Sequence, residues 1–566
     1  MCALWVWAPS IEGQIINGIG ASEVQENSGQ TYPVRGTVIN SVTHQPIARV
    51  LANGQQDAVL TDGEGRFELQ LAAGSSVLQL QRPGYTPSNE PQIIQVGPDL
   101  PEITLNLRPD ALITGQVMFS DSSPAQGIRV AVYRRSVENG RSQWVNQASA
   151  STNSEGSFRL WGLQPGSYML YTQMQLDREG QAGASYGYPA VYYPGTDEPT
   201  PGGILVLTAG QHAQADLTLT RQPFYPVTVR VAMAEMGGMS FQVYESGGQI
   251  AGVPVRVNRR DGTVQFSVPN GSYYLEAERY DMQNNGGGGG PRRGRSRGVG
   301  AYGRVDFRIA NAPLSGLNLV LSPLQGLRVN VRKDFTVSNN NDTRGDQVVF
   351  AGQNGEVASN PGFTMMLSAA GDTVAPRSMS AQLTPVEGTN DDTAFEFGRV
   401  TPGKYWVTIF AFVGYVSSVT SGGVDLSREP LVVGAGGASA PLEVTLRDDT
   451  GTISGQITSL QSGSGANPGS TLGVRSQTFV YAIPLFSTSQ QLMQGAASPS
   501  GDLSIPNLAP GTYRVIAFDH QQNIDFHSPE EMAKYSSMGK TVTVEAGGAV
   551  NVQLDSVETE NGESSE

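Results

Sequence analysis

The chain has 566 residues, of which 38% are hydrophobic and only 15% are charged, and its net charge is −15. An acidic chain is a poor general binder of nucleic acid, because phosphate contacts need an excess of Lys and Arg. The single cysteine, Cys2, excludes an intrachain disulfide and a thiolate zinc cluster. The 69 glycines and 34 prolines are typical of a turn-rich β protein, and no long amphipathic helix pattern competes with this interpretation.

Residues 1–31 form a polar N-terminal segment that opens with a short apolar block and continues without periodicity. The block lacks a basic flank and is too short to span a membrane, so it is incomplete as a signal peptide. We interpret it as the remnant of an export signal that begins further upstream. This predicts an extracytoplasmic protein (periplasmic, cell-surface or secreted) with no membrane span in this chain.

One short motif recurs along the chain as an apolar residue, Pro, Gly and Tyr, or a close variant. The copies lie at 163–168, 267–273, 400–405 and 508–513, with a degenerate first copy at 71–76. Pro presets φ and Gly tolerates positive φ, so each copy predicts a β-hairpin turn between two short strands. Spacings of 92, 105, 132 and 108 residues between the glycines predict one small all-β domain per repeat. The tyrosines of the motif are expected in the core or at the corner.

The predicted fold is therefore all-β, a tandem array of about five β-sandwich domains. Their boundaries are placed at 32–108, 109–222, 223–325, 326–450 and 451–555. The third unit carries a Gly/Arg-rich loop and the fourth a long polar insertion, while 556–566 is an acidic tail expected to be disordered. In the last unit, Ser528 as N-cap, Pro529 and two acids predict a short helix.

The first unit carries a specific resemblance. Gly36-Thr-Val38 is followed by Pro46-Ile-Ala-Arg-Val50, then by Thr61-Asp-Gly-Glu-Gly-Arg-Phe67, and then by Gly84-Tyr85. This order resembles the carboxypeptidase regulatory-like domain, here in a bacterial setting. The resemblance implies a transthyretin-like (prealbumin-like, Ig-like) β-sandwich, often grouped with carbohydrate-binding-like folds. It covers 32–222 and, with fewer motifs, 451–555. For residues 223–450, the β-sandwich class is inferred only from the spacing of the repeated Pro-Gly motif.

Catalytic motifs occur without their contexts. His527-Ser-Pro-Glu530 matches the H-x-x-E ligand pair of zinc carboxypeptidases, but no third histidine follows it and Glu530 already fits a helix start. The pattern G-x-S-x-G occurs at 183–187 and 294–298, and no helix pattern follows either copy. We therefore predict no enzymatic activity, no catalytic residue, no metal ligand and no cofactor.

Three further motifs receive ordinary structural interpretations. The Gly/Arg tract at 284–298 resembles an RNA-binding tract, but in this acidic chain we expect a flexible loop and no nucleic-acid partner. Asp57 and Asp62 lack the carboxylate ladder of a calcium site, which favours Asx-type turns. The adhesion tripeptide Arg344-Gly345-Asp346 is short enough to arise by chance.

An aromatic cluster is the candidate ligand site. Four tyrosines crowd one Gly/Pro-rich loop, and a tryptophan lies near the hairpin corner: Tyr186, Tyr188, Tyr192, Tyr193 and Trp161. Aromatic faces with a polar tip suit stacking on sugar rings. The alternative is that some of these rings pack beneath the loop and cap the edge of the domain.

The sequence thus predicts a non-catalytic, exported, multi-domain β-sandwich protein that acts as a carbohydrate-binding or surface interaction module. Its partner would be a carbohydrate or a cell-envelope protein. One alternative is a structural spacer or adhesion stalk without a small-molecule ligand. Another is an accessory region of a peptidase or an outer-membrane transport system. The sequence does not indicate the oligomeric state.

Overall fold

The computed structural model describes residues 31–54, 57–86, 92–177, 185–231, 238–282, 297–336, 361–371, 378–381, 383–386, 393–437, 439–459, 478–498, 500–519 and 521–557. Several sequence predictions lie outside these residues. They are the N-terminal remnant with Cys2, most of the Gly/Arg tract, the Arg344-Gly345-Asp346 tripeptide, and the acidic tail beyond residue 557.

The described residues form strands almost throughout, gathered in five units that we call sandwiches 1 to 5. The first four units each have two sheets, and the strands of the fifth form one continuous seven-stranded sheet. Sandwich 1 contains β1 (Thr31–Asn40), β2 (Leu51–Asn53), β3 (Ala58–Leu60), β4 (Arg66–Ala72), β5 (Gly74–Gln81), β6 (Tyr85–Thr86), β7 (Gln92–Val96) and β8 (Ile103–Pro109). Sandwich 2 contains β9 (Ala111–Phe119), β10 (Arg129–Glu138), β11 (Arg141–Ser151), β12 (Ser157–Leu163), β13 (Gly166–Thr172), β16 (Val191–Tyr192), β17 (Ile204–Leu207), β18 (His212–Gln214) and β19 (Leu217–Leu219).

Sandwich 3 contains β14 (Gln175–Leu176), β15 (Ser185–Tyr188), β20 (Gln222–Val231), β21 (Met239–Glu245), β22 (Arg256–Asn258), β23 (Thr263–Val268), β24 (Gly271–Met282), β25 (Arg297–Ile309), β26 (Leu314–Leu319) and β27 (Ser322–Pro323). Sandwich 4 contains β28 (Gly326–Asp334), β29 (Phe363–Ala369), β30 (Ser378–Ala381), β31 (Thr384–Pro385), β32 (Ala394–Arg399), β33 (Gly403–Ala411), β34 (Tyr415–Ser421), β35 (Val424–Asp425), β36 (Leu431–Val433) and β37 (Leu442–Arg447). Sandwich 5 contains β38 (Gly451–Ser459), β39 (Phe479–Pro484), β40 (Met493–Ala496), β41 (Asp502–Leu508), β42 (Gly511–Phe518), β43 (Lys540–Val544) and β44 (Ala549–Val557).

The same topology recurs in all five units. The opening strand of each unit pairs in parallel with the closing strand and antiparallel with the strand that precedes the Pro-Gly motif. In sandwich 1, for example, β1 pairs with β8 on one side and β4 on the other, and in sandwich 5 β38 pairs with β44 and β41. Each unit also encloses its own cluster of buried apolar side chains. The predicted all-β tandem array is confirmed.

The prediction of a β-hairpin at each Pro-Gly motif is wrong. The strands on either side of the motif do not pair with each other. β12 and β13 of sandwich 2 belong to opposite sheets, and β41 and β42 of sandwich 5 are separated by β38 and β44 in one continuous sheet. The motif is therefore an arch that carries the chain across the core. Its glycine takes positive φ, +144° at Gly166 and +156° at Gly511, a region that side chains with a Cβ avoid.

The tyrosine of the motif closes this arch, as its predicted core position requires. The hydroxyl of Tyr168 donates to the carbonyl of Gln164 at 2.6 Å, and that of Tyr513 donates to the carbonyl of Ala509 at 2.7 Å. Tyr405 makes the same bond to Thr401, and Tyr273 makes a longer one to Asn270. Because an arch has no ladder bond across it, the buried hydroxyl satisfies a corner carbonyl that strand pairing leaves free.

The loop after β13 joins two sandwiches. Its strands β14 and β15 pair with each other, and β15 then pairs with β20 of sandwich 3. Met174 lies in the buried cluster of sandwich 3, with Leu176 packed against it. Sandwich 2 thus supplies two strands and part of the core to its neighbour.

The short helix α1 (Pro529–Lys534) begins where the sequence predicts. Ser528 is its N-cap and accepts a hydrogen bond from the backbone N–H of Glu531. No helix in the described part of the chain is long and apolar enough to cross a bilayer.

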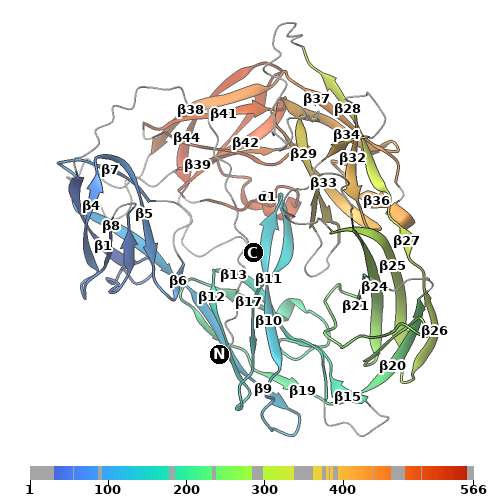
Figure 1. The fold of residues 1–566 in the computed structure, drawn as a ribbon. Coiled ribbons are helices and arrows are strands. Elements are labelled where there is room, and N and C mark those ends of the chain that lie inside the picture. The colour runs from blue at the N-terminus through green and yellow to red at the C-terminus, as the bar shows by residue number, and fades with distance from the viewer. Residues whose placement is uncertain are drawn as a thin grey trace, which may run out of the picture.

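Figure 1 shows sandwiches 2 to 5 following one another around an arc, with sandwich 1 beside the strands of sandwich 2. The hairpin made of β10 and β11 projects from sandwich 2 across the inside of the arc and reaches α1 of sandwich 5. The chain therefore brings together surfaces that lie almost 400 residues apart in sequence.

Replacing Tyr513 with Phe tests the role of the corner hydroxyl. The variant leaves the Ala509 carbonyl without its buried donor, so we expect unfolding of sandwich 5 to become easier by about 1–2 kcal/mol. Tyr186→Phe is the matched control, because this tyrosine is exposed to water and its hydroxyl can be hydrated. Chemical denaturation followed by hydrogen exchange in 478–557 makes the comparison, and equal effects of the two variants would contradict the assignment.

Candidate functional site

The structure separates the five predicted ligand residues into buried and exposed positions. Tyr192 is 1% exposed and lies in a stack of rings, with its centroid 5.4 Å from that of Tyr171, which in turn lies 5.5 Å from Tyr133. Its hydroxyl is buried without a hydrogen-bond partner. Both faces of the Tyr192 ring are thus unavailable for stacking on a sugar. The alternative of packing beneath the loop holds for this residue.

Tyr188 and Tyr193 are half-buried against the core of sandwich 2. The Tyr188 ring stacks on Phe119 with the centroids 4.5 Å apart, and the backbone N–H of Tyr193 donates to the carbonyl of Leu170. These two rings stabilise the loop on the sandwich.

Tyr186 and Trp161 remain exposed, at 37% and 68% respectively. Tyr186 lies on β15 beneath the guanidinium of Arg221, which sits 4.4 Å from the ring centroid and forms an ion pair with Asp177. Trp161 lies on β12, which faces sandwich 1, while β15 runs beside β20 of sandwich 3 (Figure 1). The five residues do not form one aromatic surface. Carbohydrate binding stays a prediction, and only these two rings offer a free face to it.

Near the buried Tyr192 lies one carboxyl group that the sequence did not single out. Burial raises the pKa of Glu245 to about 7, and burial together with this carboxylate raises the pKa of Tyr192 well above its usual value. Glu245 pairs across strands with Tyr273, at the junction of sandwiches 2 and 3.

Histidines do not gather with acids in the described residues, where no group of three metal-ligating side chains occurs. His212 contacts Thr114 through its ring at 2.8 Å, and His44 lies in a turn with φ of +55°. His520 lies outside the described residues. In the H-x-x-E match that the sequence analysis set aside, Glu530 is exposed in the first turn of α1 and the ring of His527 packs on Phe526 with the centroids 4.2 Å apart.

A second site of contact between distant parts of the chain is the docking of the β10–β11 hairpin. Its tip (residues 138–142) meets sandwich 4 and sandwich 5 together. The guanidinium of Arg141 lies 3.6 Å from the ring centroid of Trp406, and Asn139 Nδ2 donates to Met366 Sδ at 3.0 Å. On the other side, the backbone N–H of Ser142 donates to Asp525 Oδ2 at 2.8 Å.

Backbone geometry at the tip fits this docking closely. Asn139 and Gly140 both take positive φ, at +52° and +71°, as a two-residue hairpin turn with native twist requires. A Cβ at Gly140 would lie 2.0 Å from the ring of Phe526. Glycine is therefore needed at this position both for the turn and for the contact.

Charges at the docked tip are partly removed from water. Burial lowers the pKa of Arg141 to about 10, although Asp525 raises it in part. Burial, with Arg141 nearby, lowers the pKa of His527 to about 4, so the imidazole is neutral at neutral pH. The contact thus holds one partly buried cation on an indole ring, and partial loss of water strengthens the cation–π attraction.

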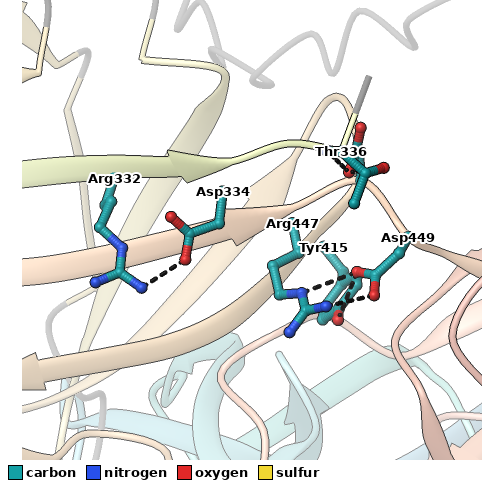
Figure 2. A network of polar contacts seen from close by, with 7 residues as sticks. Arg332, Asp334, Thr336, Tyr415, Arg447 and Asp449 are labelled. Atoms are coloured by element: carbon teal, nitrogen blue, oxygen red, sulfur yellow. Dashed lines mark hydrogen bonds and ion pairs between the residues drawn. The ribbon is translucent and has the colours of Figure 1, made fainter. Parts of the chain in front are cut away.

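Sandwiches 4 and 5 also contact each other directly. Ile409 pairs with Gln490 as an isolated bridge, and the backbone N–H of Ile409 donates to the carbonyl of Ser489 at 2.8 Å. The segment that links the two sandwiches is held by side chains, which Figure 2 shows. Asp449 accepts two hydrogen bonds from Arg447 and one from the Tyr415 hydroxyl, at 2.5–3.0 Å. Asp448 accepts the backbone N–H of Thr336 at 2.8 Å.

Sequence reasoning missed these joints. The dipeptide Asn139-Gly140, between two runs of alternating apolar and polar residues, is a local signal for a β-hairpin. Its docking partners, Trp406 and Asp525, carry no local pattern that points back to residue 140. The aromatic stack likewise includes Tyr133 and Tyr171, which the sequence analysis did not consider.

No known protein-family model matches the sequence, and no curated protein matches it significantly. Among solved structures, the chain is similar to the Bacillus anthracis TIE protein, at 12% identity over 51% of this chain and 50% of that one, with a TM-score of 0.16. A Streptococcal ancillary pilin matches at 12% identity over 51% and 99% of the two chains, with a TM-score of 0.17. The major pilin subunit BcpA of Bacillus cereus matches at 8% identity over 79% and 99%, with a TM-score of 0.13. The chain thus spans half the length of the first of these. Likenesses of this size carry no argument about function.

Replacing Gly140 with Ala tests whether the hairpin tip is docked. The new Cβ would collide with Phe526, so we expect the tip to leave its site and trypsin to cleave after Arg141 at least tenfold faster. Gly127→Ala is the matched control, since Gly127 has a similar φ of +74° and nothing within 4 Å of a built Cβ. Both variants incur a backbone cost of about 1–2 kcal/mol, so only the collision differs. Equal cleavage in the two variants would show that the tip is not held.

Proposed function

We propose that this protein is a non-catalytic, extracytoplasmic scaffold in which sandwiches 2 to 5 act as one rigid interaction platform. The observation that carries the proposal is the docking of the β10–β11 tip between Trp406 and Asp525. This contact ties sandwich 2 to sandwiches 4 and 5 by a route independent of the covalent chain.

Two further joints support rigidity. Sandwich 2 donates β14 and β15 to sandwich 3, and the linker after β37 is fixed by Asp448 and Asp449. The backbone N–H of Gln325 also donates to Gly436, at the boundary of sandwiches 3 and 4. A platform needs such fixed joints, because partners bound at separate domains are then held at defined distances.

The alternative of an extended stalk has less support, since a spacer gains reach from domains that follow each other in a line. The alternative of an accessory region in a peptidase or an outer-membrane transport system agrees with the resemblance to the carboxypeptidase regulatory-like domain. A rigid platform would serve that role too, so the two are compatible. The N-terminal apolar block supports the proposed extracytoplasmic location.

Small-angle X-ray scattering of the whole chain tests the platform. A compact chain of this length has a radius of gyration of about 25 Å, whereas five domains in a line would extend roughly 170 Å. We expect a radius of gyration closer to the compact value, unchanged between low and high salt. A maximum dimension near that of the linear string would refute the platform and favour the stalk.

Carbohydrate binding is a second candidate function, favoured by the exposed Trp161. Its ring is 68% exposed beside Gly162, which takes φ of +72° at an irregularity in the pairing of β12. A large apolar ring left in water at a sheet edge suits stacking on a sugar ring.

A glycan array with the whole protein tests this candidate. We expect any signal to fall at least tenfold in Trp161→Ala and to persist in Tyr225→Phe, which removes only a hydroxyl at a half-buried ring of sandwich 3. Loss of one ring that stacks on a sugar weakens binding by ~1–2 kcal/mol, which corresponds to a fall in affinity of roughly tenfold. Glycan binding that survives the Trp161 replacement would exclude this residue as the site.

A further inference from the structure

Two arginines meet at the junction of sandwiches 1 and 2 without an ion-pair partner among the described residues. The first, Arg134 on β10, lies opposite Tyr168 in the pairing of β10 with β13. Its Nη1 donates to Gln164 Oε1 and its Nη2 to the carbonyl of Pro165, both at 2.9 Å. Both acceptors are neutral, so they satisfy hydrogen bonds and leave the charge uncompensated.

The second, Arg108, arrives at the same corner from sandwich 1. It lies at the end of β8, where the carbonyl of Pro109 accepts a hydrogen bond from Gly210 at 3.0 Å. Three residues beyond Arg108, Ala111 pairs with Leu163, the residue before Gln164. This pairing places Arg108 close to the Pro165-Gly166 arch, to which Arg134 is hydrogen-bonded.

The charge balance at this corner is positive. The nearest carboxylate, Asp110, is hydrogen-bonded to the hydroxyl of Thr86 and makes no ion pair with either arginine in the described structure. Burial and the charge of Arg134 lower the pKa of Arg108, and the charge of Asp110 offsets part of this effect. The Nε of Arg134 is buried and has no hydrogen-bond partner.

Such an arrangement is costly in a chain whose net charge is −15, because acidic side chains are plentiful, yet the nearby Asp110 forms an ion pair with neither arginine in the described structure. Partly desolvated guanidinium groups that form no ion pair are unfavourable, and their fork of donors matches the oxygens of an oxyanion. We propose that Arg108 and Arg134 form a binding site for an oxyanion, a carboxylate, sulfate or phosphate group, at the junction of sandwiches 1 and 2.

The site lies at the same end of sandwich 2 as Trp161, which precedes Gln164 by three residues on β12. The oxyanion could therefore be a free ion or the acidic group of a sugar. These two sources share one chemistry. The proposal does not depend on the platform function, since it rests on the corner of sandwich 2 and the end of β8 alone.

Calorimetric titration of the whole protein with sodium sulfate, at ionic strength held constant with sodium chloride, tests the site. We expect one sulfate per chain, and binding that weakens about tenfold or more in Arg108→Gln and in Arg134→Gln, since each loses a charge-assisted hydrogen bond. Arg135→Gln is the matched control, because this neighbouring arginine is exposed and should leave the affinity unchanged. Parallel titrations with phosphate and with a galacturonate oligomer separate a free ion from a sugar acid as the tighter ligand.

A second readout guards against loss of folding. Without sulfate, Arg108→Gln should melt at a higher temperature than the native protein, because it removes the repulsion from Arg134, whereas Arg108→Lys should retain part of the sulfate binding. Absence of sulfate binding beyond the chloride control would overturn the proposal and leave Arg134 as a brace of the arch only. Sulfate affinity that is unchanged in Arg108→Gln would overturn it as well.

Discussion

The architecture depends on one contact between distant segments, the seating of the β10–β11 tip between sandwiches 4 and 5. Arg141 gives up water to lie on Trp406, and Asp525 receives the backbone N–H of Ser142. A partly buried charge is tolerated only where ring face and carboxylate replace its hydration. This contact closes a loop of four sandwiches, so any motion that opens the arc must expose Arg141 and leave Asp525 without this donor.

Within each sandwich a simpler device repeats. The Pro-Gly arch joins two strands that do not pair with each other, and the tyrosine that follows donates to a corner carbonyl that no ladder satisfies. Because the device is local, each sandwich carries its own core and corner. The joints between sandwiches can then vary, from donated strands at β14 and β15 to the carboxylate-braced linker at Asp449. Each sandwich therefore repeats the same arch and tyrosine, while each junction between sandwiches is held by a different set of contacts.

The sequence predicts the units and fails at their junctions, for a physical reason. The period of the Pro-Gly motif, the N-cap Ser528 and the Asx turn at Asp62 are local signals, and the structure confirms the class they predict. Whether the motif is a hairpin or an arch depends on which sheet the next strand joins, and local turn chemistry does not determine that. The sequence also did not determine that Tyr192 is buried and Trp161 exposed, because an aromatic residue in a Gly/Pro-rich stretch can take either position. The charge pair at Arg108 and Arg134 carries no motif, since it arises only when two sandwiches meet.

The most direct test of the closed arrangement is a distance distribution between spin labels on opposite sides of it. Labels at Gln147→Cys on β11 and Asn551→Cys on β44, in a Cys2→Ser background, would report through pulsed electron–electron resonance. The docked tip predicts a single narrow distance that broadens when Gly140 is replaced with Ala. A broad distribution in the protein with native Gly140 would contradict the account.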